Sequence, residues 1–236
     1  MKRLHFLFSL NSLVVVLVSI ERFSFTTHIL LQPYQFLRLH EAVQITVLIL
    51  ATAIIPFFLL KEVTDNFSLL TKGKKSNLFL GVLFLAGIYL YASGNAFHEL
   101  ASFTLNQYCN VSTLSSPLCQ GLFLNDYYTG NVLYFVGALL FTIALILLEV
   151  AQPHLEMTRR DIWLLLPNCL IYALAIVAYA GFDRVLVGLV YSLCTTIVVV
   201  GILLINRKVV RRLPLTNYTA LTYLIGTLIA CLVRFH

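Results

Sequence analysis

Two His-Glu dipeptides, His40-Glu41 and His98-Glu99, are the residues with the clearest capacity for chemistry in this sequence. Each is the first half of an HExxH pattern, in which two imidazoles one helical turn apart bind zinc and the glutamate activates water. The second histidine of the pattern is missing from both segments. A zinc-hydrolase site would therefore need side chains from both segments together.

The two segments predict one metal site assembled from separate helices. His40 and His98 are the expected nitrogen ligands of a divalent transition metal such as zinc, with Asp126 as the oxygen ligand. Glu41 is an alternative oxygen ligand, and either Glu41 or Glu99 would serve as the general base. Three protein ligands leave a coordination position open for water, which suits hydrolysis.

Each of these residues also has an interpretation without chemistry. His98 could be a neutral imidazole bonded to a tyrosine or asparagine of a neighbouring helix. His40 and Glu41 could form an interfacial pair at a helix amino terminus, where the helix dipole favours a carboxylate. Asp126 could cap the helix that follows it, form a turn, or orient a histidine.

A row of polar residues accompanies His98 on one face of a predicted helix. At the helical spacing i, i+4, i+7 and i+11, they are Tyr91, Asn95, His98 and Ser102. Polar groups in a membrane span are expensive and are retained mainly where they face the protein interior or a wet cavity. Tyr127 and Asn131, near Asp126, could orient a histidine, bind a lipid headgroup or belong to an interfacial aromatic belt.

The composition places these segments in a membrane. Of the 236 residues, 60% are hydrophobic and 11% are charged, and the mean hydropathy is +0.91, too apolar for a soluble domain of this length. The formal net charge of +6 comes from basic residues in short loops, where they orient the chain in a bilayer. We therefore expect membrane lipids as neighbours and no nucleic-acid partner.

Seven apolar segments have the roughly 20 residues that a helix needs to cross a bilayer. The predicted spans are 5–23, 42–60, 78–104, 131–150, 162–181, 185–206 and 217–235. No repeat or low-complexity tract interrupts them, so residues 1–236 are predicted to form one all-α bundle of seven transmembrane helices. The first span is expected to remain uncleaved, because no small-x-small signal-peptidase site follows it.

The basic residues predict the orientation of the bundle. With the amino terminus in the cytoplasm, twelve lie inside: Lys2, Arg3, Lys61, Lys72, Lys74, Lys75, Arg159, Arg160, Arg207, Lys208, Arg211 and Arg212. Four lie outside: Arg22, Arg38, Arg184 and Arg234. Because cytoplasmic loops carry an excess of Lys and Arg, the sequence predicts a cytoplasmic amino terminus and a carboxyl terminus outside. Both His-Glu dipeptides then lie at the outer end.

Cys109 and Cys119 lie in the connection after the third span, which this orientation exposes to an oxidising compartment. They are ten positions apart and are predicted to form a disulfide. The remaining cysteines lie inside spans and are interpreted as small apolar packing residues: Cys169, Cys194 and Cys231.

These features favour an integral membrane protein with a polar His, Glu and Asp pocket at its outer end, acting as a metal-dependent hydrolase on a lipid or another amphipathic substrate. Two other classes stay open. A sensor, receptor or assembly partner would use the outer end to bind a ligand or another membrane protein. A small-solute transporter is less favoured, because no acidic residue lies near the middle of a span.

Overall fold

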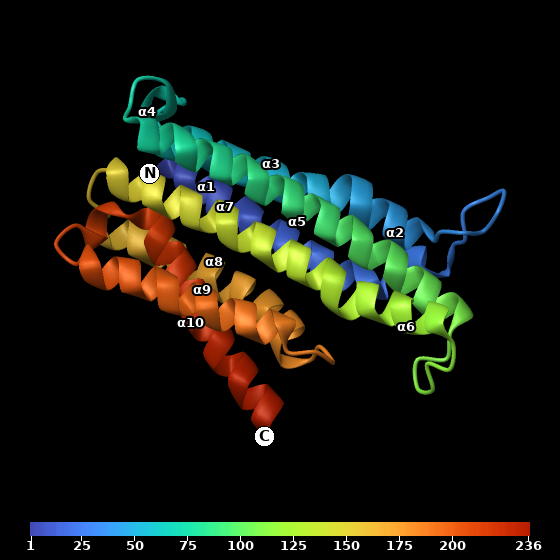
Figure 1. Ribbon diagram of the computed structural model, residues 1–236. Coiled ribbons are helices and arrows are strands. Elements are labelled where there is room, and N and C mark those ends of the chain that lie inside the picture. Colours follow the sequence, from blue (N-terminus) through green and yellow to red (C-terminus); the bar gives the residue numbers. More distant parts are fainter.

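The computed structural model describes all 236 residues, and its regular elements are all helical (Figure 1). Seven helical stretches are long and apolar enough to cross a membrane: Lys2–His28, Leu39–Val63, Lys75–Tyr108, Pro117–Ala151, Arg159–Gly181, Val187–Ile205 and Pro214–Phe235. The protein is thus an integral, multi-pass membrane protein. The predicted all-α bundle of seven helices is confirmed.

Several of these stretches consist of more than one helical segment. The α-helices are α1 Lys2–Ile20, α2 Leu39–Val43, α3 Ile49–Val63, α4 Ser68–Thr71, α5 Lys75–Tyr108, α6 Pro117–Leu124, α7 Asn131–Ala151, α8 Arg159–Ile176, α9 Val187–Ile205 and α10 Pro214–Phe235. Short 3₁₀ segments are η1 Glu21–Phe23, η2 Phe25–His28 and η6 Val210–Arg212. The π-helical segments are η3 Gln44–Leu48, η4 Asn125–Gly130 and η5 Val177–Gly181.

The fourth span begins at Pro117, well before the predicted start at 131. Ser116 caps this helix, because its side chain accepts a hydrogen bond from the Cys119 backbone N–H, and Pro117 occupies the first turn. The polar stretch 125–131 interrupts the apolar pattern without ending the helix. A boundary placed by hydropathy alone therefore falls too late.

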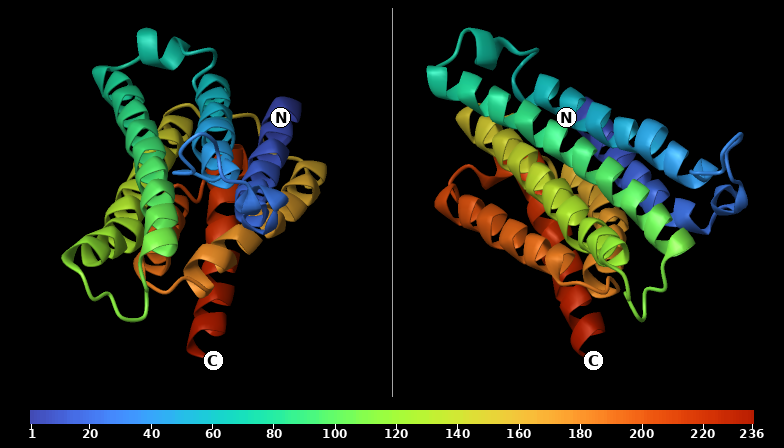
Figure 2. Two further views of the ribbon diagram at one scale, coloured as in Figure 1. Left: turned by 90° about the vertical axis from the view of Figure 1, so that its right-hand side faces the viewer. Right: turned by 45° about the vertical axis from the view of Figure 1, so that its right-hand side comes forward.

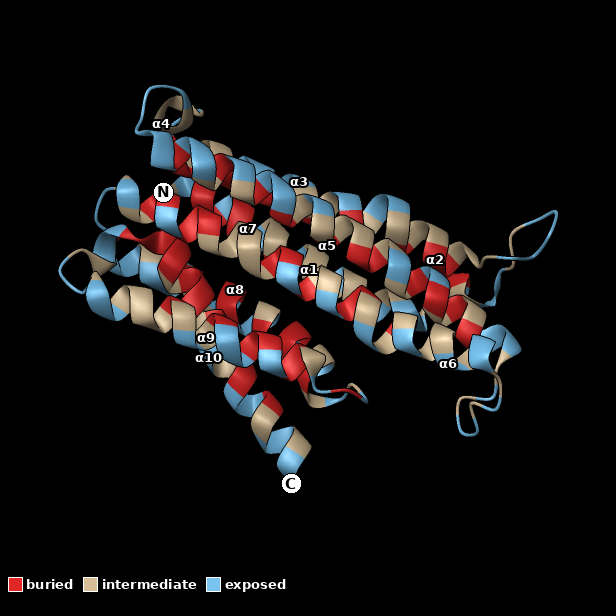
Figure 3. Cartoon of the chain, viewed as in Figure 1, coloured by how far each residue is buried: buried red, intermediate tan, exposed pale blue.

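The bundle has two ends, which we call the amino-terminal end and the distal end. The amino-terminal end holds Met1, α4 and the connections between α7 and α8 and between α9 and α10; the distal end holds the α1–α2, α5–α6 and η5–α9 connections (Figure 1). Helix α10 crosses its neighbours obliquely and carries the carboxyl terminus to the distal side (Figure 2). Buried residues face between the helices, and the exposed outward faces are largely apolar, as a lipid-facing surface requires (Figure 3).

Helices α5 and α7 pack with their backbones in contact through two pairs of glycines. A Cβ on Gly94 would lie 2.2 Å from the Tyr134 backbone nitrogen, and one on Gly130 would lie 2.8 Å from Cα of His98. The second pair, Gly87 and Gly137, makes the same kind of contact deeper in the bundle. Small residues let membrane helices approach this closely. The contact sets the η4 segment directly against His98.

The three π-helical segments all lie toward the distal end of their spans. A π turn inserts one extra residue into a helix, and such turns are frequent at functional sites. In η4 the displaced backbone carbonyl of Asp126 lies 3.0 Å from Nδ1 of His98 and 3.4 Å from the amide nitrogen of Asn131. The π turn therefore lets the Asp126 backbone carbonyl accept hydrogen bonds from side chains at the distal end.

Glu149 fixes the start of α10 from inside the protein. This wholly buried carboxylate accepts hydrogen bonds from the backbone N–H groups of Leu215 and Thr216, each at 2.8 Å, and from the Thr216 hydroxyl at 2.6 Å. The amino terminus of a helix carries unpaired N–H groups and a partial positive charge, which suit an anion. Glu149 thereby joins α7 to α10.

The glycine contacts predict a test of the α5–α7 interface. Gly94→Ala is expected to destabilise the protein by about 1–3 kcal/mol, because the new methyl group meets backbone that cannot move aside. Thermal unfolding in detergent measures the effect. Gly201→Ala in α9 is the matched control, since nothing lies within 4 Å of its Cβ position, and it should be neutral or stabilising. Equal melting temperatures for both variants would contradict this account of the interface.

Candidate metal centre at the distal end

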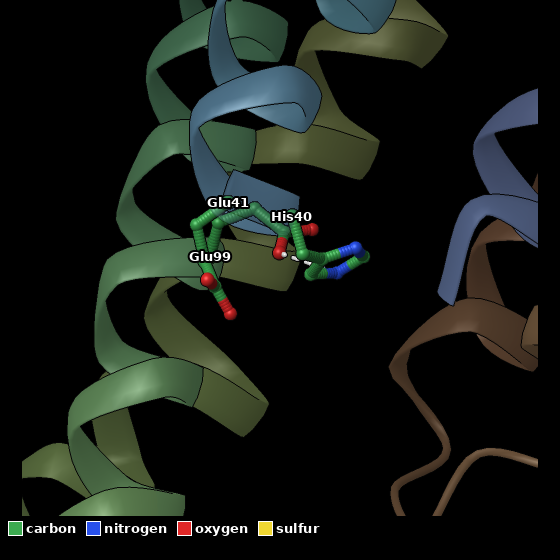
Figure 4. Close-up of side chains that lie close together, drawn as sticks. All are labelled: His40, Glu41 and Glu99. Atoms are coloured by element: carbon green, nitrogen blue, oxygen red, sulfur yellow. Dashed lines mark ion pairs between the residues drawn. The ribbon is translucent and has the colours of Figure 1, made fainter. Parts of the chain in front are cut away.

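Three ionisable side chains from two helices meet at the distal end: His40 and Glu41 from the first turn of α2, and Glu99 from α5 (Figure 4). One potential ligand atom from each lies within 4.8 Å of the other two. Their exposed fractions are 6%, 1% and 6%. Nε2 of His40 is 3.7 Å from Oε2 of Glu99. We call these three residues the distal cluster.

Glu21, at the end of the first span, orients the His40 ring. Its carboxylate contacts Nδ1 of His40. The carboxylate is held in turn by the side chains of Ser24, Thr26 and Gln44, the last donating from 3.4 Å. With Nδ1 against Glu21, Nε2 is the nitrogen directed toward Glu99. A carboxylate behind one ring nitrogen is the usual support of a metal-binding histidine.

Arg38 holds Glu41 in place. The backbone N–H of Arg38 donates to Oε2 of Glu41 at 3.1 Å, and its Nε donates to Oε1 at 2.9 Å. In the first of these bonds Glu41, the third residue of α2, reaches back to the backbone N–H that precedes the helix. Glu41 is thereby fixed and partly neutralised inside the protein. Glu99, by contrast, accepts no hydrogen bond, and its ion-pair neighbour within 4.0 Å is the His40 imidazole.

His98 and Asp126 form a second pair beside the distal cluster. Nδ1 of His98 lies 2.8 Å from a carboxylate oxygen of Asp126, and Asp126 is 2% exposed. Nδ1 is hydrogen-bonded to the Asp126 backbone carbonyl, and the nearby carboxylate oxygen is its ion-pair neighbour without a hydrogen bond of its own. Both contacts are to Nδ1, which leaves Nε2 for another partner. This is the arrangement in which aspartate orients a histidine that acts as a general base.

One cavity of about 910 Å³ joins the cluster and the pair. It is lined by His40, Glu41, His98, Glu99 and Asp126, and also by Tyr91, Asn95, Ser102, Tyr127 and Asn131. The structure thus gathers at one cavity every residue that the sequence singled out for catalysis, metal binding or ligand binding. Its volume is within the range of small-molecule sites.

The predicted binding residues differ in how their polar groups are used. The hydroxyl of Tyr134 donates to that of Tyr91 at 3.2 Å, and the Asn131 amide donates to the backbone of Tyr127 at 3.1 Å. Ser102 accepts from Asn106 at 3.4 Å. Asn95 is the exception, because its buried Nδ2 has no partner.

The metal ligands that the sequence predicts are His40, His98 and Asp126, and of these only His40 lies in the distal cluster. His98 and Asp126 pair with each other instead. That ligand set stays a prediction. The cluster favours the oxygen ligand that the sequence offered as the alternative, Glu41, together with Glu99.

Sequence reasoning did not assign Glu21, Arg38 or Gln44 to the site. A signal for Glu21 and Arg38 was present, since both are charged and flank the distal ends of the first two spans. Asp183 and Arg184 also line the cavity. Burial raises the pKa of Asp183, against the lowering effect of the Arg184 backbone N–H, and the Arg184 guanidinium lies 5.9 Å from the Tyr127 ring centre.

The Cys109 and Cys119 sulfur atoms lie at disulfide distance, 2.06 Å, with their Cα atoms 5.7 Å apart. They close the connection between α5 and α6 at the distal end. This geometry is compatible with the predicted pairing.

Comparison of the chain with models of known protein families, with curated proteins and with solved structures finds no match.

Proposed function

We propose that this protein is a metal-dependent membrane hydrolase that acts on a lipid-like substrate. The observation that carries the proposal is the distal cluster, in which one imidazole nitrogen and two buried carboxylates converge at the wall of a large cavity. One nitrogen and two oxygen ligands suit zinc or a similar divalent transition metal. Glu21 supplies the carboxylate that supports a metal-binding histidine.

The charges at the distal cluster support a bound cation. Glu21, Glu41 and Glu99 lie close together with one guanidinium, that of Arg38, bonded to Glu41. A buried carboxylate without a compensating charge costs several kcal/mol. Glu99 accepts no hydrogen bond. A divalent cation would offset this negative charge and occupy the position that the three ligand atoms enclose.

The neighbouring pair supports hydrolysis. A bound metal would lower the pKa of a coordinated water molecule. His98, oriented by Asp126, would take a proton from the attacking water as the water oxygen bonds to the substrate carbonyl carbon. The bond from that carbon to the leaving oxygen or nitrogen would then break, and His98 would pass the proton to the leaving group. The products are a carboxylic acid and an alcohol or amine.

The distal end is proposed to face away from the cytoplasm. Twelve basic residues lie at or near the amino-terminal end and four at the distal end, a distribution typical of a cytoplasmic amino terminus. The Cys109–Cys119 pair at the distal end fits an oxidising compartment.

Metal content tests the distal cluster. We expect about one divalent transition metal per chain in the wild-type protein, and its loss from His40→Ala and Glu99→Gln, because each removes a ligand. Elemental mass spectrometry on detergent-purified protein measures it. His28→Ala is the control, since this exposed histidine lines the same cavity outside the cluster. A metal-free wild type, or equal metal in all variants, would exclude the centre.

The His98–Asp126 pair predicts a separable effect on rate. His98→Gln and Asp126→Asn are each expected to lower the hydrolysis of a long-chain p-nitrophenyl ester by roughly 10²–10⁴-fold, because proton transfer is impaired. Metal content should stay at the wild-type level in both variants. Unchanged hydrolysis in His98→Gln would remove this residue from the mechanism.

The orientation can be tested by labelling intact cells with a membrane-impermeant maleimide. Tyr34→Cys, in the exposed α1–α2 connection, should react, whereas Lys72→Cys, near α4, should react only after the membrane is opened. The parent protein measures the background from its free cysteines. The opposite pattern would place the distal cluster on the cytoplasmic side.

A further inference from the structure

The cavity that holds the distal cluster extends far into the bundle. Along the second span its lining runs from His40 to Leu59, nineteen positions or about 28 Å of helix. The hydrocarbon core of a bilayer is about 30 Å thick. The cavity therefore follows the bundle through most of the membrane thickness, with the cluster at one end of it.

The inner wall of the cavity is formed largely by aromatic rings, and several of their hydroxyls are already hydrogen-bonded within the protein. The tyrosines are Tyr91, Tyr134, Tyr172, Tyr179, Tyr191, Tyr218 and Tyr223. Tyr191 and Tyr223 pair at 2.5 Å, and Tyr218 pairs with Ser12 at 2.8 Å. Hydroxyls that bond to each other leave the ring faces as the available surface. Such a wall suits an alkyl chain better than an ion or a sugar.

An amide group on the wall has no hydrogen-bond partner within the protein. Asn95 is 6% exposed, lines the cavity, and its Nδ2 makes no hydrogen bond. It lies four positions before Glu99 on α5, on the same face and one turn further inward. An unpaired buried N–H costs roughly 1–3 kcal/mol, which a ligand carbonyl oxygen would recover.

The depth of His98 in the membrane matches that of the ester or amide linkages of lipids. His98 is 23 positions along α5 from Lys75, about 34 Å of helix. With Lys75 at one surface of the bilayer, His98 lies at the opposite boundary between hydrocarbon and headgroups. The linkages that join acyl chains to headgroups lie at this boundary.

We propose that the substrate is a long-chain acyl ester or amide that lies lengthwise in this cavity. Its carbonyl oxygen accepts a hydrogen bond from Asn95, its scissile bond faces His98, and its chain lies along the tyrosine-lined wall toward Leu59 and Leu145. This assignment rests on the proposed hydrolase function. Asn95 is then a positioning residue, and the depth of the cavity selects the length of the acyl chain.

Chain binding can be measured apart from catalysis. Doxyl-stearic acid is the spin-labelled probe, and an immobilised electron paramagnetic resonance signal reports its binding to the purified, metal-analysed protein. Monopalmitoylglycerol, palmitoyl-lysophosphatidylcholine and monooctanoylglycerol compete with it. The first two distinguish a neutral from a phosphate-bearing source of the acyl chain. We expect both long-chain esters, or one of them, to displace the probe at concentrations at least about tenfold below those of the octanoyl ester.

Two variants narrow the inner cavity. Ala138→Phe and Thr142→Phe, one turn apart on α7, each place a ring in the cavity. Either variant should weaken the binding of the long-chain competitors about tenfold or more and leave the binding of the octanoyl ester unchanged. Ala86→Phe is the matched control, because Ala86 is exposed on α5 and lies outside the cavity. If one narrowing variant fails to fold, the other carries the test.

Asn95 has its own comparison. Asn95→Leu should weaken the binding of monopalmitoylglycerol about tenfold. The binding of its hexadecyl ether analogue should stay unchanged, because the ether has no carbonyl oxygen. A metal-containing protein that fails to immobilise the probe, or narrowing variants that match Ala86→Phe, would overturn the chain site and leave the hydrolase proposal standing. Probe binding by a wild type without metal would overturn the hydrolase proposal and keep the chain site.

Discussion

The backbone contact between α5 and α7 is the constraint on which the distal end depends. Gly94 and Gly130 remove the side chains that would hold the two helices apart, and Gly130 lies against the backbone of His98. The Asp126 carboxylate can reach the His98 ring only because η4 is that close. Glu99, the next residue on α5, also lines the cavity. A contact between two glycines and a neighbouring backbone thus brings Asp126 to His98.

The two histidines of the distal end are supported in the same way from different parts of the chain. Glu21 contacts Nδ1 of His40, and Asp126 contacts Nδ1 of His98. In each case a carboxylate lies against Nδ1 of a ring and leaves Nε2 for another partner. The difference lies in what surrounds the second nitrogen: two carboxylates beside His40, and the open cavity beside His98. This asymmetry is the physical reason for assigning metal binding to the first and proton transfer to the second.

The sequence predicts the seven-helix bundle well, because a bilayer requires each span to be apolar and about 20 residues long. It also identifies the residue types at the distal end, since ionisable groups stand out in such a chain. What it could not supply is the pairing: that Glu21 rather than Asp126 meets His40 depends on which helices are neighbours. The sequence also did not predict that the fourth span starts at Pro117 or that Glu149 binds the start of α10. Both depend on helix capping, which a hydropathy pattern does not detect.

The π turns allow the seven-helix bundle to be kept in evolution while the arrangement of the distal residues is lost. Each of η3, η4 and η5 is an insertion of one residue carried within an otherwise regular span. In an α-helix one residue corresponds to a rotation of about 100°. A lineage that lost one residue from Asn125–Gly130 would keep seven apolar helices and the Gly87–Gly137 contact, but its Asp126 would be turned relative to α7. Bundles of this shape with ordinary helices in these places would then be expected among chains without the chemistry proposed for the distal end.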